Sequence, residues 1–184
     1  QSRASRRWAE QHDYGAISNI VYMGMGEPLA NRKAIHPSLT ILNQGYGVGA
    51  RRITVSTVGV VPGIVELANR PEQFKLALSL HAPSGELRRD LIPLEKRYPL
   101  PEVLAALERF DDGGGKRITF EYTLLEGEND SPEDARRLVS LLHGIRSKVT
   151  LIFWNPFDDA GFRPVPWDSR RHHPGAEGLR TYRA

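Results

Sequence analysis

The chain has 184 residues, 40% of them hydrophobic, which is enough for one sizeable core and gives no sign of a second. Its formal net charge of +3 permits a nucleic-acid partner without requiring one, and the absence of cysteine excludes disulfides, thiolate nucleophiles and cysteine-ligated metals within these residues. No apolar run approaches the roughly 18 residues of a membrane span, and the polar N-terminus has no signal-peptide core, so we expect a cytoplasmic domain without a membrane partner.

A short buried strand leading into a glycine loop is the first informative stretch. Residues 1–18 are polar and predict the end of a helix, whereas residues 19–23 have the β-branched and aromatic content of a strand. Gly24 and Gly26 then let the chain turn or let a ligand approach the backbone, and Glu27 follows as a hydrogen-bond acceptor for a ligand ammonium or hydroxyl group. Taken alone, the stretch fits more simply a strand-to-helix turn with an exposed glutamate. It matches neither a dinucleotide fingerprint nor a P-loop.

Helical and strand-like segments alternate through the rest of the chain. Asn31 is a candidate helix cap, Gly45 and Gly47 are stop signals, and Ser131-Pro132-Glu133-Asp134 is a strong helix start. We predict helices at residues 32–43, 62–68, 101–110 and 131–143, a short turn from Ser84 or Gly85 to residue 91, and strands at residues 51–57, 74–81, 117–125 and 149–154.

Five strands separated by helices indicate a parallel sheet built from right-handed βα units, either open or closed into a barrel. Three of the strands alternate apolar residues with small or polar ones, which is unusual for parallel strands covered on both faces. An incomplete parallel (β/α) barrel explains this alternation best, because its outer face packs on helices while its inner face lines a cavity for a ligand.

The polar residues that end these strands predict a binding site. The carboxyl ends of parallel strands share one edge of the sheet, where α/β proteins bind their ligands. Each residue has a plain structural alternative, such as a turn histidine or a strand hydroxyl, so the prediction depends on the whole set. The set comprises Gly26, Glu27, Ser56, Thr57, Ser79, His81 and Asn155.

Five motifs in order resemble the radical S-adenosylmethionine (SAM) RNA methyltransferases of the RlmN/Cfr family, most closely the RlmN branch. They are MGMGEPL at residues 23–29, RRITVST at 51–57, LSLHAP at 78–83, FEY at 120–122 with Asn129 and Asp130, and WNPF at 154–157. The resemblance covers residues 17 to 157. It implies an enzyme that methylates carbon 2 of adenine in large-subunit ribosomal RNA and in transfer RNA.

The resemblance also implies a fold and a set of cofactor contacts. Residues 1–157 are expected to form a partial radical SAM barrel with about five of its six strands, and residues 158–184 a divergent, irregular tail. By position in the motifs, SAM would contact Gly26 and Glu27, Ser56, the Ser79-Leu80-His81 segment and Asn155.

The departures from the family are as informative as the matches. Members hold a four-iron four-sulfur cluster through three cysteines before the first motif and use two further cysteines in catalysis, and this chain has none. We therefore assign it no catalytic residue and no metal ligand. It is expected to be an internal fragment that holds most of the SAM-binding half and is inactive alone. The implied partners are ribosomal RNA, transfer RNA and an electron donor for the cluster.

Two other functions remain open from the sequence. One is a non-catalytic module that binds SAM or a nucleotide, and the other is a metal-independent αβ-barrel enzyme that uses Glu121 and His81 as acid and base. For Glu121, a carboxylate hydrogen-bonded to neighbouring threonines is the simpler expectation. His172 and His173 are adjacent without a third ligand, which is more typical of a solvated polar patch than of a metal site.

Overall fold

A single sheet of five parallel strands forms the centre of the molecule. The computed structural model describes residues 2–14, 17–111, 118–155 and 161–166. The strands lie side by side in chain order and all neighbouring pairs are parallel, as the sequence predicts. They are β1 (Ile20–Tyr22), β2 (Ile53–Thr57), β3 (Lys75–Ser79), β4 (Ile118–Leu124) and β5 (Ser147–Phe153).

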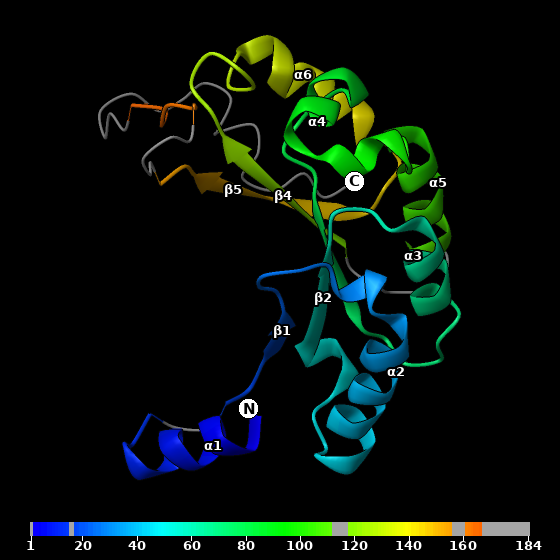
Figure 1. Cartoon of the computed structure of the whole chain (residues 1–184), viewed down its shortest axis with the longest axis vertical. Helices are drawn as coiled ribbons and strands as arrows, with labels where there is room; N and C mark the ends of the chain where they lie inside the picture. The colour runs from blue at the N-terminus through cyan, green and yellow to red at the C-terminus, as the bar shows by residue number, and fades with distance from the viewer. Residues whose placement is uncertain (1, 15–16, 112–117, 156–160, 167–184) are drawn as a thin grey trace.

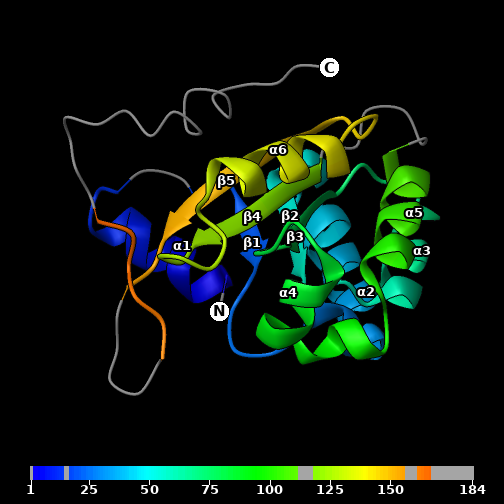
Figure 2. The same ribbon diagram turned by 90° about the horizontal axis from the view of Figure 1, so that it is seen from above.

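The sheet is curved, and the helices that follow its strands cover only the convex side (Figure 1). This arrangement confirms the predicted partial barrel and rules out helices on both faces. The first helix lies beyond β1, apart from the others, in both ribbon views (Figures 1 and 2). The helices are α1 (Ser2–Gln11), α2 (Arg32–Thr40), α3 (Val61–Ala68), α4 (Gly85–Leu91), α5 (Leu100–Asp111) and α6 (Pro132–Leu141). Short helical turns lie at Pro28–Ala30, Ile41–Gly45, Ala50–Arg52 and Pro93–Lys96.

Strand register separates the apolar core from the polar inner face. Val55, Leu76 and Ile118 are register partners across three strands, and all three are fully buried beneath the helices. One residue later, the row of Ser56, Ala77 and Thr119 belongs to the concave face. The same alternation continues with Leu78, Phe120 and Tyr122 on the convex side. As predicted, apolar side chains lie under the helices, and small or polar ones line the concave face.

The predicted helices and strands are present, and most of their ends shift by one or two residues. The helix predicted at residues 32–43 differs more, because α2 ends at Thr40 and a separate helical turn follows at Ile41–Gly45. Ser131 caps α6, as expected from the sequence, and it also exchanges hydrogen bonds with Asp134 in a capping box. Asn31 does occupy the N-cap of α2, but its side chain makes no capping hydrogen bond, so the prediction of a side-chain cap is wrong there. Its backbone carbonyl accepts instead from Ala34 and Ile35.

Part of the predicted tail packs against the barrel. Pro164 forms an isolated antiparallel bridge with Leu125, and the carbonyl of Arg163 accepts from the amide of Glu126 at 3.0 Å. Val165 is buried. Residues 156–160 and 167–184, including His172 and His173, lie outside the described residues, so the predicted domain boundary stays a prediction. Among the helices that the structure describes, none is long and apolar enough to cross a membrane.

Candidate functional site

The loop after β1 is fastened to the rest of the sheet by Glu27. One carboxylate oxygen accepts from the amide of Leu29 at 2.9 Å, and the other from the amide of Val58, just past β2, at 2.8 Å. Gly26 has φ +117°, a conformation that residues with a side chain rarely adopt, which explains the glycine. Glu27 is therefore a structural staple as well as a candidate ligand contact, and each of its oxygens keeps a second lone pair.

Two serines and one glutamate meet on the concave face. The hydroxyl of Ser79 donates to Oε2 of Glu121 at 3.2 Å, and that of Ser56 donates to the same oxygen at a longer 3.5 Å. The expectation that threonines would hold Glu121 is wrong, because its carboxylate accepts from the two serines instead. With both hydroxyl protons directed at Glu121, the serine oxygens can accept hydrogen bonds from a ligand.

His81 is fixed in one orientation and one charge state. Its backbone is left-handed, with φ +56°, and its Nδ1 accepts from the amide of Thr123 at 3.1 Å. Burial, assisted by the nearby Arg88 guanidinium, lowers the pKa of His81 to about 4. The ring is therefore neutral at pH 7 with its proton on Nε2, where it can donate to a ligand. A ring so hard to protonate argues against His81 as the acid of an acid–base pair with Glu121.

Asn129 holds the ends of β3 and β4 together, a role that the sequence analysis did not identify. Its buried side chain donates to the carbonyls of His81 at 2.7 Å and Thr123 at 2.8 Å, and accepts from the amide of Leu125. This clamp sets the left-handed turn at His81. Asn129 did stand in a recognised motif, but an asparagine after a strand also fits an ordinary turn, so its role could not be read from the pattern.

A buried ion pair beneath the site was also not predicted from the sequence. Arg88 and Glu95 contact each other with side-chain exposures of 0% and 2%. In the sequence, Arg88 is one of two consecutive arginines in a short polar helix, and its neighbour Arg89 is exposed. Nothing in the pattern distinguishes the two.

The remaining predicted residues occupy different places. The Leu80 side chain is fully buried in the core, so only its backbone could contact a ligand, while its amide donates to the carbonyl of Glu121 at 3.0 Å. Asn155 is exposed two residues beyond the end of β5. Ser56 and Ser79 thus share Glu121 as a hydrogen-bond acceptor, whereas strand order alone puts Asn155 at the same carboxyl edge of the sheet.

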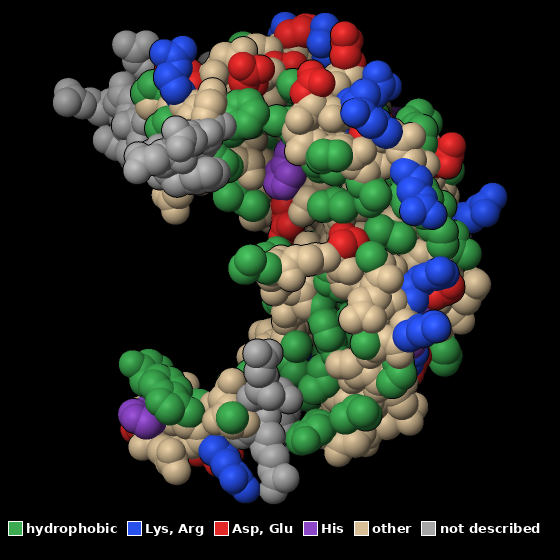
Figure 3. All heavy atoms as spheres, viewed as in Figure 1, with side chains coloured by type: hydrophobic (Ala, Val, Ile, Leu, Met, Phe, Trp, Pro, Cys, Tyr) green, Lys and Arg blue, Asp and Glu red, His purple; other side chains and the backbone are tan. Residues whose placement is uncertain are grey.

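The concave face combines negative charge with directed hydrogen-bonding groups. Figure 3 shows this side hollowed, with acidic and histidine side chains on its wall. The carboxylates of Glu27 and Glu121 favour a ligand with positive charge, and the serine oxygens and the Nε2–H of His81 add an acceptor pair and a donor. Within the part of the chain that the structure describes, no three His, Cys, Asp or Glu side chains gather as metal ligands would.

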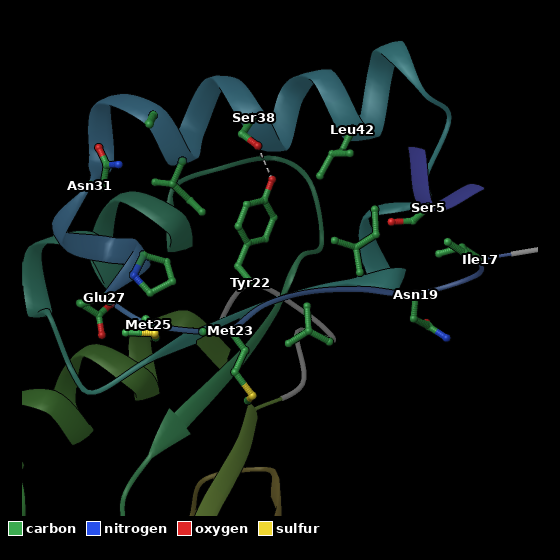
Figure 4. Close-up of a pocket in the computed structure, with 17 residues that line it drawn as sticks. Ser5, Ile17, Asn19, Tyr22, Met23, Met25, Glu27, Asn31, Ser38 and Leu42 are labelled. Atoms are coloured by element: carbon green, nitrogen blue, oxygen red, sulfur yellow. Dashed lines mark hydrogen bonds between the residues drawn. The ribbon is translucent and has the colours of Figure 1, made fainter. Parts of the chain in front are cut away.

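A hollow of about 800 Å³ runs along the outer edge of β1, between that strand, its following loop and α2. Figure 4 shows the Tyr22 side chain reaching from β1 to a hydrogen bond with Ser38 of α2. Glu27 and Met25 lie at one end of the hollow, and Ser5 and Ile17 lie at the other. The hollow therefore adjoins the candidate site at the glycine loop.

Comparison with known proteins gives a consistent result. The family model described as the Radical SAM superfamily matches residues 5–139. The chain is 54% identical over 149 residues to the "Probable dual-specificity RNA methyltransferase RlmN" of Gemmatimonas aurantiaca, covering 80% of this chain and 40% of that protein. It is 47% identical over 160 residues to the protein of the same name from Moorella thermoacetica, covering 86% of this chain and 45% of the relative. The chain thus spans less than half the length of these relatives.

Solved structures agree with the fold. A radical SAM methyltransferase from Sphaerobacter thermophilus superposes with a TM-score of 0.83 at 47% identity, over 88% of this chain and 48% of that one. A domain of the pyruvate-formate lyase-activating enzyme from Bacteroides vulgatus superposes with a TM-score of 0.61 at 15% identity, over 82% of this chain and 86% of that one, which supports the fold alone. The resemblance identified from the sequence motifs is confirmed by these matches.

Proposed function

The chain belongs to the radical SAM superfamily, and we propose that the concave face of its partial barrel binds S-adenosylmethionine. The observation that carries the proposal is the convergence of Glu27, Glu121 and two serine hydroxyls at the carboxyl ends of adjacent strands. The proposed contacts are Gly26, Glu27, Ser56, Ser79, the backbone of Leu80, His81 and Asn155.

The chemistry of the ligand suits these groups. S-adenosylmethionine carries an ammonium and a sulfonium, both positive, together with two ribose hydroxyls and a carboxylate. Glu27 has free lone pairs for the ammonium, and Glu121 places a second negative charge on the same wall. The serine oxygens accept from hydroxyl or ammonium donors, and the Nε2–H of His81 donates without changing protonation near neutral pH.

The iron–sulfur cluster of the superfamily does not fit these residues. Such clusters are held by cysteine thiolates, and the 184 residues contain no cysteine. When bound, the cluster supplies the electron that cleaves S-adenosylmethionine. These residues do not hold it, so their proposed part is to bind and orient the cofactor. On its own, the 184-residue chain therefore also fits the alternative of a module that binds S-adenosylmethionine without radical chemistry.

For the whole protein, we infer an RNA methyltransferase similar to RlmN. Support comes from identities of 44–54% with relatives named as dual-specificity RNA methyltransferases. The inferred reaction is methylation of carbon 2 of adenine in ribosomal and transfer RNA. The inferred partners are these RNAs and an electron donor for the cluster, and the inferred location is the cytoplasm. A negatively charged RNA is compatible with the net charge of +3.

Isothermal titration of S-adenosylmethionine into the 184-residue chain tests the proposed binding. Ser79→Ala removes one neutral hydrogen-bond partner and should weaken binding by about two- to tenfold. Ser140→Ala is the matched control, because Ser140 is exposed on α6, on the convex side. It should leave the affinity unchanged. No binding by the wild type, or equal affinities for wild type and Ser79→Ala, would contradict the proposed site.

A further inference from the structure

Arg88 connects the ends of two strands from below the concave face. Its guanidinium pairs with Glu95 and donates to the backbone carbonyl of Val58, just past β2, and to that of Ser79, the last residue of β3, at 3.4 Å. Its side chain is fully buried, so it would not contact a ligand on the concave face. One planar group therefore holds two neighbouring strand ends at a fixed separation.

Both of these strand ends carry proposed ligand contacts. The amide of Val58 donates to Glu27 at 2.8 Å, so the residue whose carbonyl Arg88 holds also holds the Glu27 carboxylate. Ser79, whose carbonyl Arg88 also holds, directs its hydroxyl to Glu121 at 3.2 Å. A displacement of the Arg88 guanidinium would therefore move Glu27 and Ser79 relative to each other.

Stability alone is a weak reason for this buried pair. Replacing a buried ion pair with apolar residues is often neutral or stabilising, because two charges must be removed from water. Within the part of the chain that the structure describes, Nε of Arg88 is buried without a hydrogen-bond partner, so the arrangement is not the one that satisfies the guanidinium best. Gly59 lies beside the guanidinium and packs closely on α5, since a Cβ there would lie 3.0 Å from the Val103 side chain.

We propose that Arg88 is a positioning residue that sets the spacing of Glu27 and Ser79 for S-adenosylmethionine through its bonds to the two strand ends, with Glu95 as the counter-ion that offsets its buried charge. This inference rests on the proposed function. Glu95 contributes through a second bond as well, because its other oxygen accepts from the amide of Leu100 at the start of α5 and so fixes the carboxylate.

Three variants of the 184-residue chain separate positioning from stability. Arg88→Met leaves the Glu95 charge buried without a cationic partner, so it should be strongly destabilised. The double variant Arg88→Met/Glu95→Gln carries no buried charge and keeps an acceptor for Leu100, so it should recover much of that stability. Glu95→Gln alone keeps the hydrogen bonds from Arg88 to Val58 and Ser79. It should lose stability but change the affinity for S-adenosylmethionine by less than about threefold.

The expected result is that affinity does not follow stability. The double variant should bind S-adenosylmethionine about tenfold more weakly than Glu95→Gln, even if it unfolds at a higher denaturant concentration. Affinities that simply rank with stability across the three variants would overturn the proposal.

Hydrogen exchange of the Val58 amide, followed by NMR, is the second readout and needs no ligand. In the double variant, this amide should exchange at least tenfold faster than in the wild type, while core amides of β3 keep their protection. Unchanged exchange at Val58 would refute the positioning role even if S-adenosylmethionine binds. Loss of protection at Val58 in a chain that does not bind S-adenosylmethionine would instead refute the proposed function alone.

Discussion

At the scale of single residues, the site is built from side chains that also hold the backbone. Glu27, His81 and Asn129 each bind amides or carbonyls of neighbouring segments. The sequence placed Glu27 and His81 at strand ends but did not predict their protein partners. Residue type and spacing report where a group stands along the chain, whereas the hydrogen bond that the Val58 amide donates to Glu27 joins residues 31 positions apart.

Glu27→Gln should affect folding and binding together. The amide of the new side chain would face one of the two backbone N–H groups that Glu27 accepts from, placing donor against donor. We expect a loss of about 1 to 3 kcal/mol in the free energy of unfolding, and a loss of about 1.5 to 3 kcal/mol in binding of S-adenosylmethionine. Denaturant titration and calorimetry measure the two.

The exposed Glu128 offers a matched control for this change, and Glu128→Gln should alter neither quantity. If Glu27→Gln unfolds at the wild-type denaturant concentration and binds with the wild-type dissociation constant, Glu27 has neither role.

His81 should make folding weaken on mild acidification. Its pKa is about 4 in the folded chain and near 6.5 when unfolded, so the unfolded chain takes up the proton first as the pH falls. The contribution of neutral His81 to the free energy of unfolding is fully present above pH 6.5 and is lost progressively as the pH approaches 4. Between pH 7 and pH 5 the loss from this residue is at most about 2 kcal/mol.

His81→Asn tests this prediction, because asparagine tolerates the left-handed backbone and cannot titrate. Urea unfolding of both proteins at pH 7 and pH 5 should give a smaller decrease for the variant. Equal decreases would show that protonation of His81 does not control acid stability.

At the scale of elements, the segments that can be predicted are those with their own sequence signals. The helix start at Ser131 and the alternating strands were evident from local patterns. The burial of Arg88 was not, because a charged residue in a short helix reveals its burial only when α4 packs against the strand ends. The close contact of α3 with the turn after β1 was also not predicted, because it too depends on how segments pack in the folded chain.

Gly63 allows that contact. A Cβ at Gly63 would lie 2.6 Å from the Cβ of Leu29, which is itself fully buried in the turn that carries Glu27. Gly63→Ala gains up to about 1 kcal/mol of helix propensity but forces overpacking that costs about 1 to 3 kcal/mol. We expect net destabilisation, measured by denaturant titration, together with weaker binding of S-adenosylmethionine.

Gly49→Ala is the comparison for this variant, since a Cβ at Gly49 meets nothing within 4 Å and φ there is −54°. It should be neutral or slightly stabilising. A Gly63→Ala chain as stable as Gly49→Ala would mean that α3 moves away from Leu29 without penalty.

At the scale of the whole molecule, the partial barrel was predictable because one-sided polarity recurred in three strands. In β4, Ile118, Phe120 and Tyr122 are buried and alternate with the partly exposed Thr119 and Glu121, a pattern that a sheet covered on both faces would not need. The hollow beside β1 could not be predicted, because it depends on how α1, α2 and the outer side of a three-residue strand are placed. Strand order fixes which residues share the concave face, and that face is the proposed cofactor site.

The most direct test of that site is an NMR titration of the isotope-labelled 184-residue chain with S-adenosylmethionine, with amide shifts mapped onto the fold. Saturable changes should be largest around Gly26, Glu27, Val58, Ser79 and His81 on the concave side, and the amides of α5 and α6 should hardly move. Shifts confined to the convex helices, or no saturable shifts at all, would contradict the claim that this face binds S-adenosylmethionine.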